Sequence, residues 1–293
     1  MSSGGPVGSA GQGAASDADL VGELARLAHS VALEAAEEVR RHAAGTISVA
    51  ATKTSDIDVV TAADRATEEL IRRLLLDARP HDAVLGEEGD DVAGTSGVRW
   101  VVDPIDGTVN FLYGIPEYAV SIAAELDGEV VAGVVVDVAK RLTYAGRVRA
   151  ASGTPGAEGP VDGEVTCEGR PLAVRGPAPL AHRLVATGFN YTREVRAVQA
   201  AAAARLLPEV RDLRRTGSCA LDLCRVAAGS LDGYVEEGVH RWDHAAAGLI
   251  ARLAGARVVV TRGAVGTEAV VAGPDDGFHE LWQAVRTAGF LQA

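Results

Sequence analysis

The stretch that most restricts the fold is the twelve-residue string WVVDPIDGTVNF, Trp100–Phe111. Its first three residues are large and apolar, which is typical of a buried strand, and Asp103 follows them directly. The proline after Asp103 has no N–H to donate to a sheet, so we expect the strand to end there. The Asp106-Gly107 pair then predicts a tight turn, because glycine tolerates backbone conformations that other residues avoid.

This turn carries ligands for a cation beside donors for an anion. Asp103, Asp106 and the carbonyl of Ile105 offer three oxygen ligands, which suit a hard divalent cation such as Mg²⁺. The adjacent amides of Gly107 and Thr108 are candidates for binding a phosphate. The segment therefore indicates metal-assisted phosphate chemistry, although Asp-Gly and Asp-Pro pairs are also common in turns that are purely structural.

Length and charge narrow the class of protein. At 293 residues the chain is long enough for one large domain or two lobes. A net charge of −12 argues against general binding to nucleic acid or to anionic membranes. Cys167, Cys219 and Cys224 show neither disulfide nor zinc spacing. Because no segment resembles a leader peptide or a membrane span, we expect a soluble cytoplasmic protein.

Apolar spacing predicts most elements of the first half. Residues 1–18 are rich in Gly, Ser and Ala and are predicted to be a disordered tail ahead of a domain at 19–293. Leucines at helical spacing predict a helix from Asp19 to about Gly45. Strands are predicted at 83–85, 120–126, 129–138 and 142–147, with a hairpin turn at Asp127-Gly128. The Gly-, Pro- and Ser-rich segment 150–163 is predicted to be a loop.

Acidic residues occur where two further elements of the first half begin or end. Thr61 is a candidate N-cap for a second helix, and Asp64 is then its third residue, where the helix dipole favours an acid. Glu87 and Glu88 follow the 83–86 segment. Adjacent glutamates are commonly solvent-exposed, but like charges at the end of a buried strand call for a cation or a basic partner. A purely structural role is open for each of them.

The second half alternates predicted strands and helices, which indicates a sheet covered by helices. Strands are predicted at 184–187, 210–213, 233–235, 258–260 and 269–272, and helices at 193–207, 218–228, 244–253 and 278–287. Asp243 lies where one of these helices begins, so an N-cap is its simplest structural role. His240 and His244 have the i,i+4 spacing of a zinc site, although the oxygen-rich set of acids favours Mg²⁺.

Five segments resemble, in the same order, the motifs of the inositol monophosphatase family. They are the segment ending at Asp64, the Gly-Glu-Glu triplet, WVVDPIDGTVNF, the helix start at Gly217 and WDHAAAG around Asp243. The resemblance extends over nearly the whole chain from about Leu20. It implies an α+β fold, a layered αβαβα sandwich with sublobes at about 19–165 and 166–293. The first would hold an antiparallel sheet and the second a mixed sheet with covering helices.

The resemblance also implies roles for individual residues. The implied cofactor is two or three Mg²⁺ ions, held by Asp64, Glu87, Asp103, Ile105, Asp106 and Asp243. The catalytic residues would be Glu87, Thr108 and Asp64, and Asp58 would be a structural acid. Substrate would be bound by Asp106, Gly107, Thr108, Ser218, Cys219, Glu236 and Asp243. Cys219 stands where the family commonly has alanine, and the 150–163 loop also departs from the pattern.

The function implied is hydrolysis of inositol 1-phosphate, or of a similar small polyol phosphate, to the alcohol and inorganic phosphate. Histidinol phosphate is the alternative substrate, since relatives of the same fold hydrolyse it. A different kind of role is that of a protein-binding partner in a transcription complex. The resemblance further implies lithium sensitivity and a homodimer, with no nucleic-acid or membrane partner.

Overall fold

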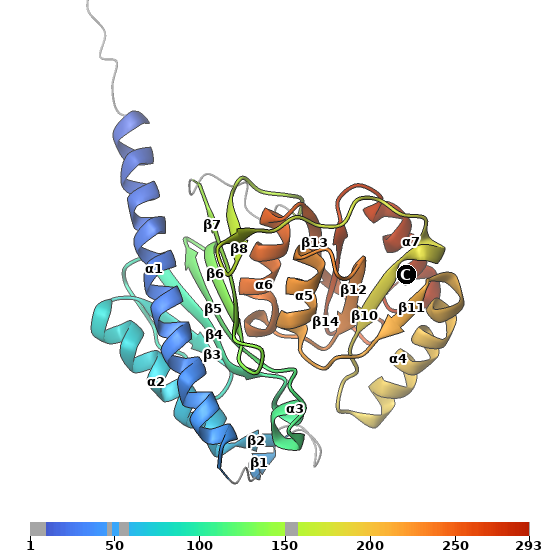
Figure 1. Cartoon of the computed structure of the whole chain (residues 1–293), viewed down its shortest axis with the longest axis horizontal. Coiled ribbons are helices and arrows are strands. Elements are labelled where there is room, and N and C mark those ends of the chain that lie inside the picture. Colours follow the sequence, from blue (N-terminus) through green and yellow to red (C-terminus); the bar gives the residue numbers. More distant parts are fainter. Residues whose placement is uncertain (1–9, 46–48, 53–58, 150–157, 293) are drawn as a thin grey trace, which may run out of the picture.

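The computed structural model describes residues 10–45, 49–52, 59–149 and 158–292. Five layers alternate between helices and sheets (Figure 1). Helices α1 (Ala10–Ala43) and α2 (Ala62–Ala78) cover the outer face of a seven-stranded sheet. Helices α5 (Cys219–Ala227) and α6 (Arg241–Leu253) lie between that sheet and a five-stranded one. Helices α4 (Arg193–Leu206) and α7 (Phe278–Ala288) cover the far side, which confirms the predicted αβαβα sandwich.

The first helix begins earlier than predicted. Residues 10–18 were expected to belong to the tail, but α1 starts at Ala10, and only residues 1–9 of that tail lie outside the described residues. Four of these nine residues are alanine, the residue with the highest helix propensity, and they continue a helix that is already formed. Further along α1, buried Leu24, Ala28, Val31 and Ala35 face the sheet at the predicted helical spacing.

The seven strands follow the order β3-β4-β5-β6-β7-β8-β9. The first sheet was predicted to be antiparallel, and all its neighbours do pair so except β3 and β4. These two are parallel, because the chain crosses over between them instead of forming a hairpin, so the sheet is mixed at one edge. The predicted hairpin turn is confirmed, with positive φ angles at Asp127 (51°) and Gly128 (88°). The strands are β3 (Ala83–Gly86), β4 (Val98–Asp106), β5 (Ala119–Leu126), β6 (Glu129–Asp137), β7 (Leu142–Val148), β8 (Gly163–Cys167) and β9 (Arg170–Pro171).

Two expectations for this sheet were wrong in detail. Strand β4 does not end at Pro104 but continues to Asp106, and its pairing with β5 shifts register between Asp103 and Asp106. A proline is tolerated at such an irregularity because no ladder bond is required of its nitrogen. The last residue of the predicted loop at 150–163, Gly163, begins β8; residues 150–157 lie outside the described residues.

The five-stranded sheet has the order β11-β10-β12-β14-β13. Strand β10 is parallel to β11 and β12, and the remaining pairs are antiparallel, so the sheet is mixed as predicted. Its strands are β10 (Leu184–Thr187), β11 (Asp212–Arg214), β12 (Gly233–Glu237), β13 (Ala256–Arg262) and β14 (Glu268–Pro274). The remaining elements are β1 (Val49–Thr52) paired with β2 (Val59–Thr61), helix α3 (Thr108–Tyr113), and the 3₁₀ turns η1 (Leu180–His182) and η2 (Leu207–Glu209).

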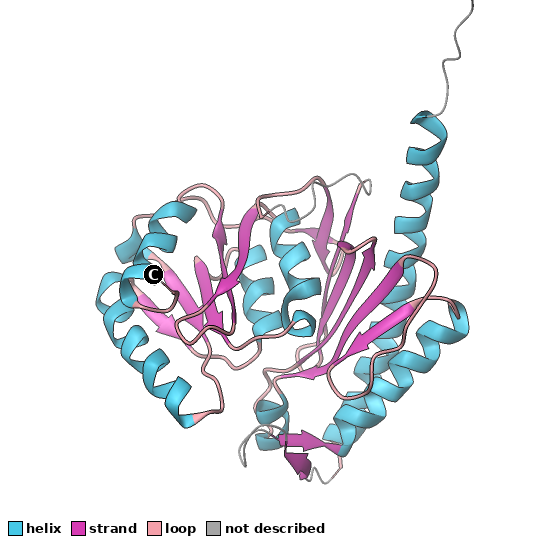
Figure 2. Ribbon diagram, turned by 180° about the vertical axis from the view of Figure 1, so that it is seen from behind, coloured by secondary structure: helices cyan, strands magenta, loops and turns pink. Residues whose placement is uncertain are grey.

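The central helix pair determines where the two halves meet. Figure 2 shows the same two helices between the sheets from behind. A Cβ atom on Gly133 of β6 would lie 2.8 Å from the carbonyl oxygen of Ala246, so glycine allows α6 to pack directly on the sheet backbone. The N-termini of α5 and α6 therefore lie beside the end of β4. No helix in the described residues is long and apolar enough to cross a bilayer.

Candidate active site

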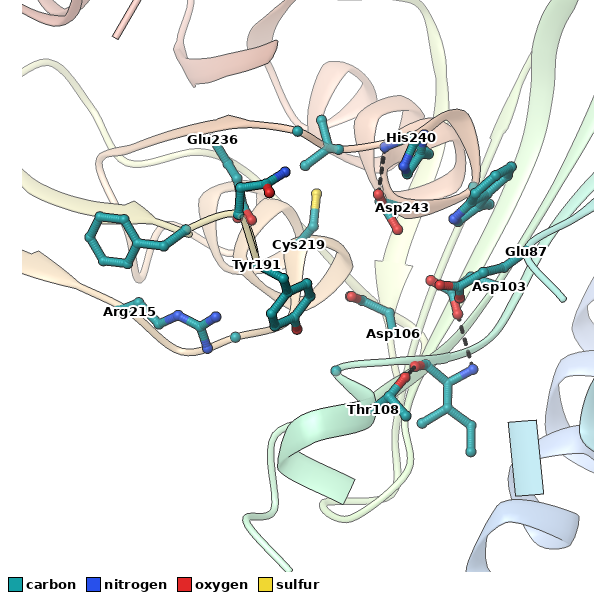
Figure 3. A pocket seen from close by; sticks show the side chains of 18 residues that line it. Glu87, Asp103, Asp106, Thr108, Tyr191, Arg215, Cys219, Glu236, His240 and Asp243 are labelled. Carbon is teal, nitrogen blue, oxygen red and sulfur yellow. Dashed lines mark hydrogen bonds between the residues drawn. The ribbon is translucent and has the colours of Figure 1, made fainter. Parts of the chain in front are cut away.

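A pocket opens where β3 and β4 end, beside the N-termini of α5 and α6 (Figure 3). The structure gathers nine of the eleven predicted site residues in its lining. The other two, Asp64 and Ser218, are hydrogen-bonded to residues in the lining. The nine are Glu87, Asp103, Ile105, Asp106, Gly107, Thr108, Cys219, Glu236 and Asp243.

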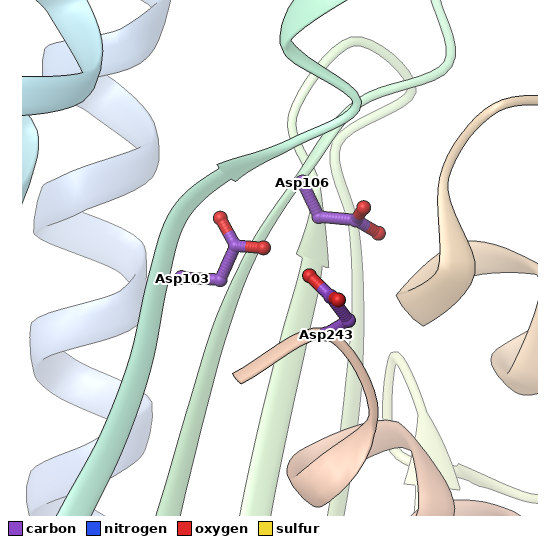
Figure 4. Close-up of side chains that lie close together, drawn as sticks. All are labelled: Asp103, Asp106 and Asp243. Atoms are coloured by element: carbon purple, nitrogen blue, oxygen red, sulfur yellow. The ribbon is translucent and has the colours of Figure 1, made fainter. Parts of the chain in front are cut away.

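Three carboxylates in this pocket are close enough to share a cation. One oxygen from each of Asp103, Asp106 and Asp243 lies within 4.8 Å of the other two (Figure 4). The first two come from the end of β4 and the third from the first turn of α6. All ligand atoms offered are carboxylate oxygens, which favour a hard divalent cation over zinc or copper. The chemistry of this donor set therefore fits Mg²⁺.

The electrostatics of the protein without a cation favour binding one. Burial raises the pKa of Asp103 well above its usual range, and the nearby carboxylates of Glu87, Asp106 and Asp243 raise it further. Burial likewise raises the pKa of Asp106 to about 7, against the hydrogen bonds that it accepts. The pKa of Asp243 is raised well above normal by burial and by the carboxylates of Glu87, Asp106 and Glu236. A divalent cation would offset this repulsion, since it neutralises like charges that are held together.

Hydrogen bonds from nearby groups hold each of the clustered carboxylates, the trio of Asp103, Asp106 and Asp243. Oδ2 of Asp106 accepts hydrogen bonds from the Ser218 hydroxyl (2.5 Å) and from the Ala220 amide (2.7 Å) at the start of α5. Oδ1 of Asp103 accepts from the amide of Ile105 (3.0 Å). These bonds place the carboxylates before any ligand binds, which lowers the ordering cost of binding.

Asp243 is not the N-cap of α6 as its simplest structural role suggested. His240 occupies that position, and Asp243 is the third helical residue, whose Oδ2 accepts from the His240 amide (2.5 Å). The zinc alternative finds no support, because the only cluster of possible metal ligands in the described residues contains no histidine. The ring of His240 stacks on Trp242, and Nε2 of buried His244 lies 2.8 Å from Glu268.

Asp64 links α2 to the turn after β4. The predicted N-cap is confirmed: Thr61 caps α2, and in the capping box that they form Oδ2 of Asp64 accepts from the Thr61 amide (2.8 Å). The Thr108 hydroxyl lies 3.1 Å from both Oδ1 of Asp64 and the carbonyl oxygen of Ile105, and donates to one of them at a time. Asp64 therefore has the structural role of a first-turn acid and also contacts the pocket. Asp58 lies outside the described residues.

The turn between β4 and α3 requires glycine. Gly107 has φ 94°, and a Cβ atom there would lie 2.8 Å from the carbonyl oxygen of Glu117. The side-chain amide of Asn110 donates to the carbonyls of Glu117 and Thr216, 2.8 Å each, and so joins this turn to the segment before α5. The amides of Gly107 and Thr108 donate to no group in the described part of the chain, which leaves them available for an anion.

Glu236 lies on the other side of the pocket. Burial raises the pKa of Glu236 to about 7, although the Tyr234 hydroxyl donates to its Oε2 (2.8 Å) and the Arg215 guanidinium also acts to lower it. A Cβ atom on Gly188, the residue after β10, would collide with this carboxylate, so glycine there leaves room for Glu236. Burial also raises the pKa of Cys219 well above normal, which keeps it a thiol and not a nucleophile.

Several residues that the sequence did not single out complete the site. Phe189, Asn190, Tyr191 and Arg215 line the pocket on the side of Glu236. Asn110 lies within the motif at Trp100–Phe111, so its place in that motif could have marked it as a site residue. The other four lie on loops after β10 and β11, where only tertiary contacts bring them to the pocket.

The loop that carries Glu87 is held by a buried acid from α2. Glu68 is only 2% exposed, and its two oxygens accept from the amides of Glu88 and Gly89, 2.8 Å each. Oε1 also accepts from Nε of Arg72 at 2.8 Å. Glu68 therefore sets the conformation of the residues that follow Glu87.

Replacing Glu68 with glutamine is expected to weaken metal binding as well as the fold. One amide N–H of the loop would face the NH₂ group of the new side chain, leaving buried donors unpaired at a cost of about 1–3 kcal/mol. We expect lower thermal stability and about a tenfold rise in the Mg²⁺ concentration that half-saturates activity. The exposed neighbour Glu69→Gln is the matched control. An E68Q variant with the Mg²⁺ titration of the wild type would refute this role.

Comparison with known proteins agrees with the geometry of the pocket. A sequence profile described as the Inositol monophosphatase family matches residues 21–288. The chain belongs to this family. Family membership indicates a phosphatase, and the Asp103, Asp106 and Asp243 cluster fits the metal dependence typical of the family.

Individual relatives cover most of the chain. The inositol-1-monophosphatase of Mycobacterium leprae (strain TN) is 46% identical over 277 residues, which cover 88% of this chain and 91% of that protein. The Nus factor SuhB of Pasteurella multocida (strain Pm70) is 37% identical over 204 residues, which cover 69% of this chain and 71% of that protein. The solved structure of Mycobacterium tuberculosis SuhB is similar with a TM-score of 0.75 and 41% identity, covering 92% of this phosphatase and 98% of that chain.

Proposed function

We propose that the protein is a Mg²⁺-dependent phosphomonoesterase that hydrolyses inositol 1-phosphate or a similar small polyol phosphate. The observation that carries the proposal is the cluster of Asp103, Asp106 and Asp243 beside the amides of Gly107 and Thr108, which bond to no group in the described residues. Cation ligands and anion donors in one pocket suit a phosphate that bridges the two. The relative from M. leprae carries the name inositol-1-monophosphatase, which supports the choice of substrate.

Two or three Mg²⁺ ions would be held by the trio together with Glu87, Asp64 and the carbonyl of Ile105. Bound Mg²⁺ would lower the pKa of the attacking water and stabilise the leaving oxygen. Five acidic side chains would otherwise repel a phosphate dianion, so the fit of the site depends on the ions.

The chain's own residues would position the phosphate and the water. The amides of Gly107 and Thr108 would donate to phosphate oxygens as negative charge develops on them. The Thr108 hydroxyl, held 3.1 Å from Asp64, and the Glu87 carboxylate would orient the attacking water and take up its proton. The Glu236 carboxylate would accept hydrogen bonds from hydroxyls of the leaving alcohol. Lithium inhibition and a homodimer belong to the same proposal.

The experiment that tests this proposal is a phosphate-release screen with and without Mg²⁺. Its substrates are inositol 1-phosphate, histidinol phosphate, fructose 1,6-bisphosphate and adenosine 3′,5′-bisphosphate. We expect release from inositol 1-phosphate that is lost in EDTA. Faster release from histidinol phosphate would favour the alternative substrate, and no release from any of the four would refute the phosphatase function.

A protein-binding role is a second candidate because one relative carries the name Nus factor SuhB. Such a role would depend on the surface, whereas catalysis depends on the pocket. Capture of transcription proteins by the wild type and equally by an inactive Asp103→Asn variant would support it. Failure of both to capture any such protein would count against it.

A further inference from the structure

Arg215 carries a positive charge in an acid-lined pocket, and no partner for it is found among the described residues. It precedes the Gly217-Ser218 turn and is solvent-exposed. Within the described residues, its guanidinium makes no hydrogen bond and no ion pair within 4.0 Å. Its neighbour Arg214 is also exposed but pairs with Asp212 at 2.5 Å, outside the pocket lining. An unpaired guanidinium keeps five N–H donors free for a ligand.

The position of Arg215 is on the leaving-group side of the pocket. Figure 3 shows Arg215, Tyr191 and Glu236 on one side, and Glu87 and Asp103 on the other. A Cβ atom on Gly217 would collide with Nη1 of Arg215, so the guanidinium packs over the turn that holds Asp106. Its charge acts on Glu236, whose pKa it lowers against the effect of burial.

The balance of charges decides which alcohols suit this side. When Mg²⁺ neutralises the carboxylates around Asp103, the charged side chains that remain on the leaving-group side are the Glu236 carboxylate and the Arg215 guanidinium. Hydroxyls can hydrogen-bond to either group. A second phosphate or carboxylate on the alcohol would find a bidentate partner in Arg215, whereas an ammonium group would be repelled by it.

We propose that Arg215 determines the charge preference of the leaving-group side, which accepts phosphomonoesters whose alcohol carries a second anionic group and disfavours those that carry an ammonium group. This inference rests on the proposed phosphatase function and narrows its substrate class. It ranks neutral and anionic polyol phosphates above histidinol phosphate.

The test compares kcat/KM for three substrates in the presence of Mg²⁺. Inositol 1-phosphate has a neutral alcohol, fructose 1,6-bisphosphate an anionic one and histidinol phosphate a cationic one. We expect Arg215→Gln to lower the ratio of bisphosphate to inositol 1-phosphate about tenfold, the scale of one hydrogen bond between charged groups. The ratio of histidinol phosphate to inositol 1-phosphate is expected to rise.

Two further variants separate charge from other effects of the substitution. Arg215→Lys keeps the charge but loses the bidentate fork, so its ratios are expected to lie between those of the wild type and R215Q. Arg214→Gln removes a neighbouring charge outside the pocket and is expected to leave the ratios unchanged. The wild-type preference for the bisphosphate is expected to fall between about 0.05 M and 0.5 M salt, because screening weakens an exposed charge.

Three results would overturn the inference while the phosphatase function stands. They are ratios in R215Q within about twofold of the wild type, an equal loss for all three substrates, and a wild type that hydrolyses inositol 1-phosphate but not the bisphosphate. Absence of phosphate release from every substrate would instead refute the proposed function itself and the inference with it.

Discussion

Replacing Asp106 with asparagine is expected to lower kcat by about a thousandfold or more, the scale of losing a group that stabilises charge in the transition state. Oδ2 of Asp106 is committed to the Ser218 hydroxyl and the Ala220 amide, so the other oxygen is the one left for a cation. If the asparagine carbonyl kept these bonds, its NH₂ group would face the cation. If it turned round, the NH₂ group would face the Ala220 N–H, donor against donor.

The measurement is single-turnover and steady-state phosphate release over a range of Mg²⁺ concentrations. Asp212→Asn, at an exposed carboxylate paired with Arg214, is the matched control and is expected to behave as the wild type. Circular dichroism and thermal unfolding would establish that D106N is folded. Activity within about tenfold of the wild type, with the same Mg²⁺ dependence, would remove Asp106 from the mechanism.

Removal of divalent cations is expected to abolish activity, and also to lower stability by an amount that grows with pH. Burial and the neighbouring carboxylates raise the pKa values of Asp103, Asp106 and Asp243 in the folded, cation-free protein. For Asp106 the pKa rises from 3.8 to about 7. The folded state therefore holds protons that the unfolded state has already released.

The sign of the pH dependence follows from this difference. Below about pH 4 both states are protonated, and the contribution of Asp106 to stability is fully present. Between about pH 4 and pH 7 the free energy of unfolding falls by about 1.4 kcal/mol per pH unit for each proton that only the folded state binds. Mg²⁺ takes the place of these protons, so its stabilising effect is expected to increase from pH 5 to pH 8.

Thermal unfolding in EDTA and in saturating Mg²⁺, each at pH 5, 6, 7 and 8, measures this effect. Subtracting the stability in EDTA from the stability in Mg²⁺ at the same pH removes the contributions of acids far from the pocket. At about one hundred times its Kd, Mg²⁺ adds about 2.7 kcal/mol to the free energy of unfolding. A Mg²⁺-induced shift that is the same at pH 5 and pH 8 would contradict the pKa assignments. Full activity in EDTA would contradict metal dependence altogether.

Local sequence determined much of the scaffold. The hairpin at Asp127-Gly128 was predictable because few residue pairs accept two successive positive φ angles. The start of α2 was predictable because Thr61 and Asp64 satisfy each other's backbone amides across a single turn. The alternating strands and helices of the second half follow from apolar periodicity, and these signals depend on neighbours a few residues apart.

Local sequence patterns could not predict that these acids lie close together in space. Asp106 and Asp243 share a cluster because α6 packs closely on Gly133, a contact between elements more than 100 residues apart. From the sequence alone, only the resemblance to a family placed them together. Their roles as metal ligands remain predictions that the variants above test.

Only the tertiary structure identified Glu68, which no motif singles out, and Arg215, which has no partner among the described residues around the pocket. Strand β4 also continues through Pro104 because the partner strand accommodates a shift in register there. The sequence by itself determined which elements form and which acids stand at their ends. The tertiary structure decided which of those ends meet, because burial, charge and unpaired donors depend on neighbours that are distant in the chain.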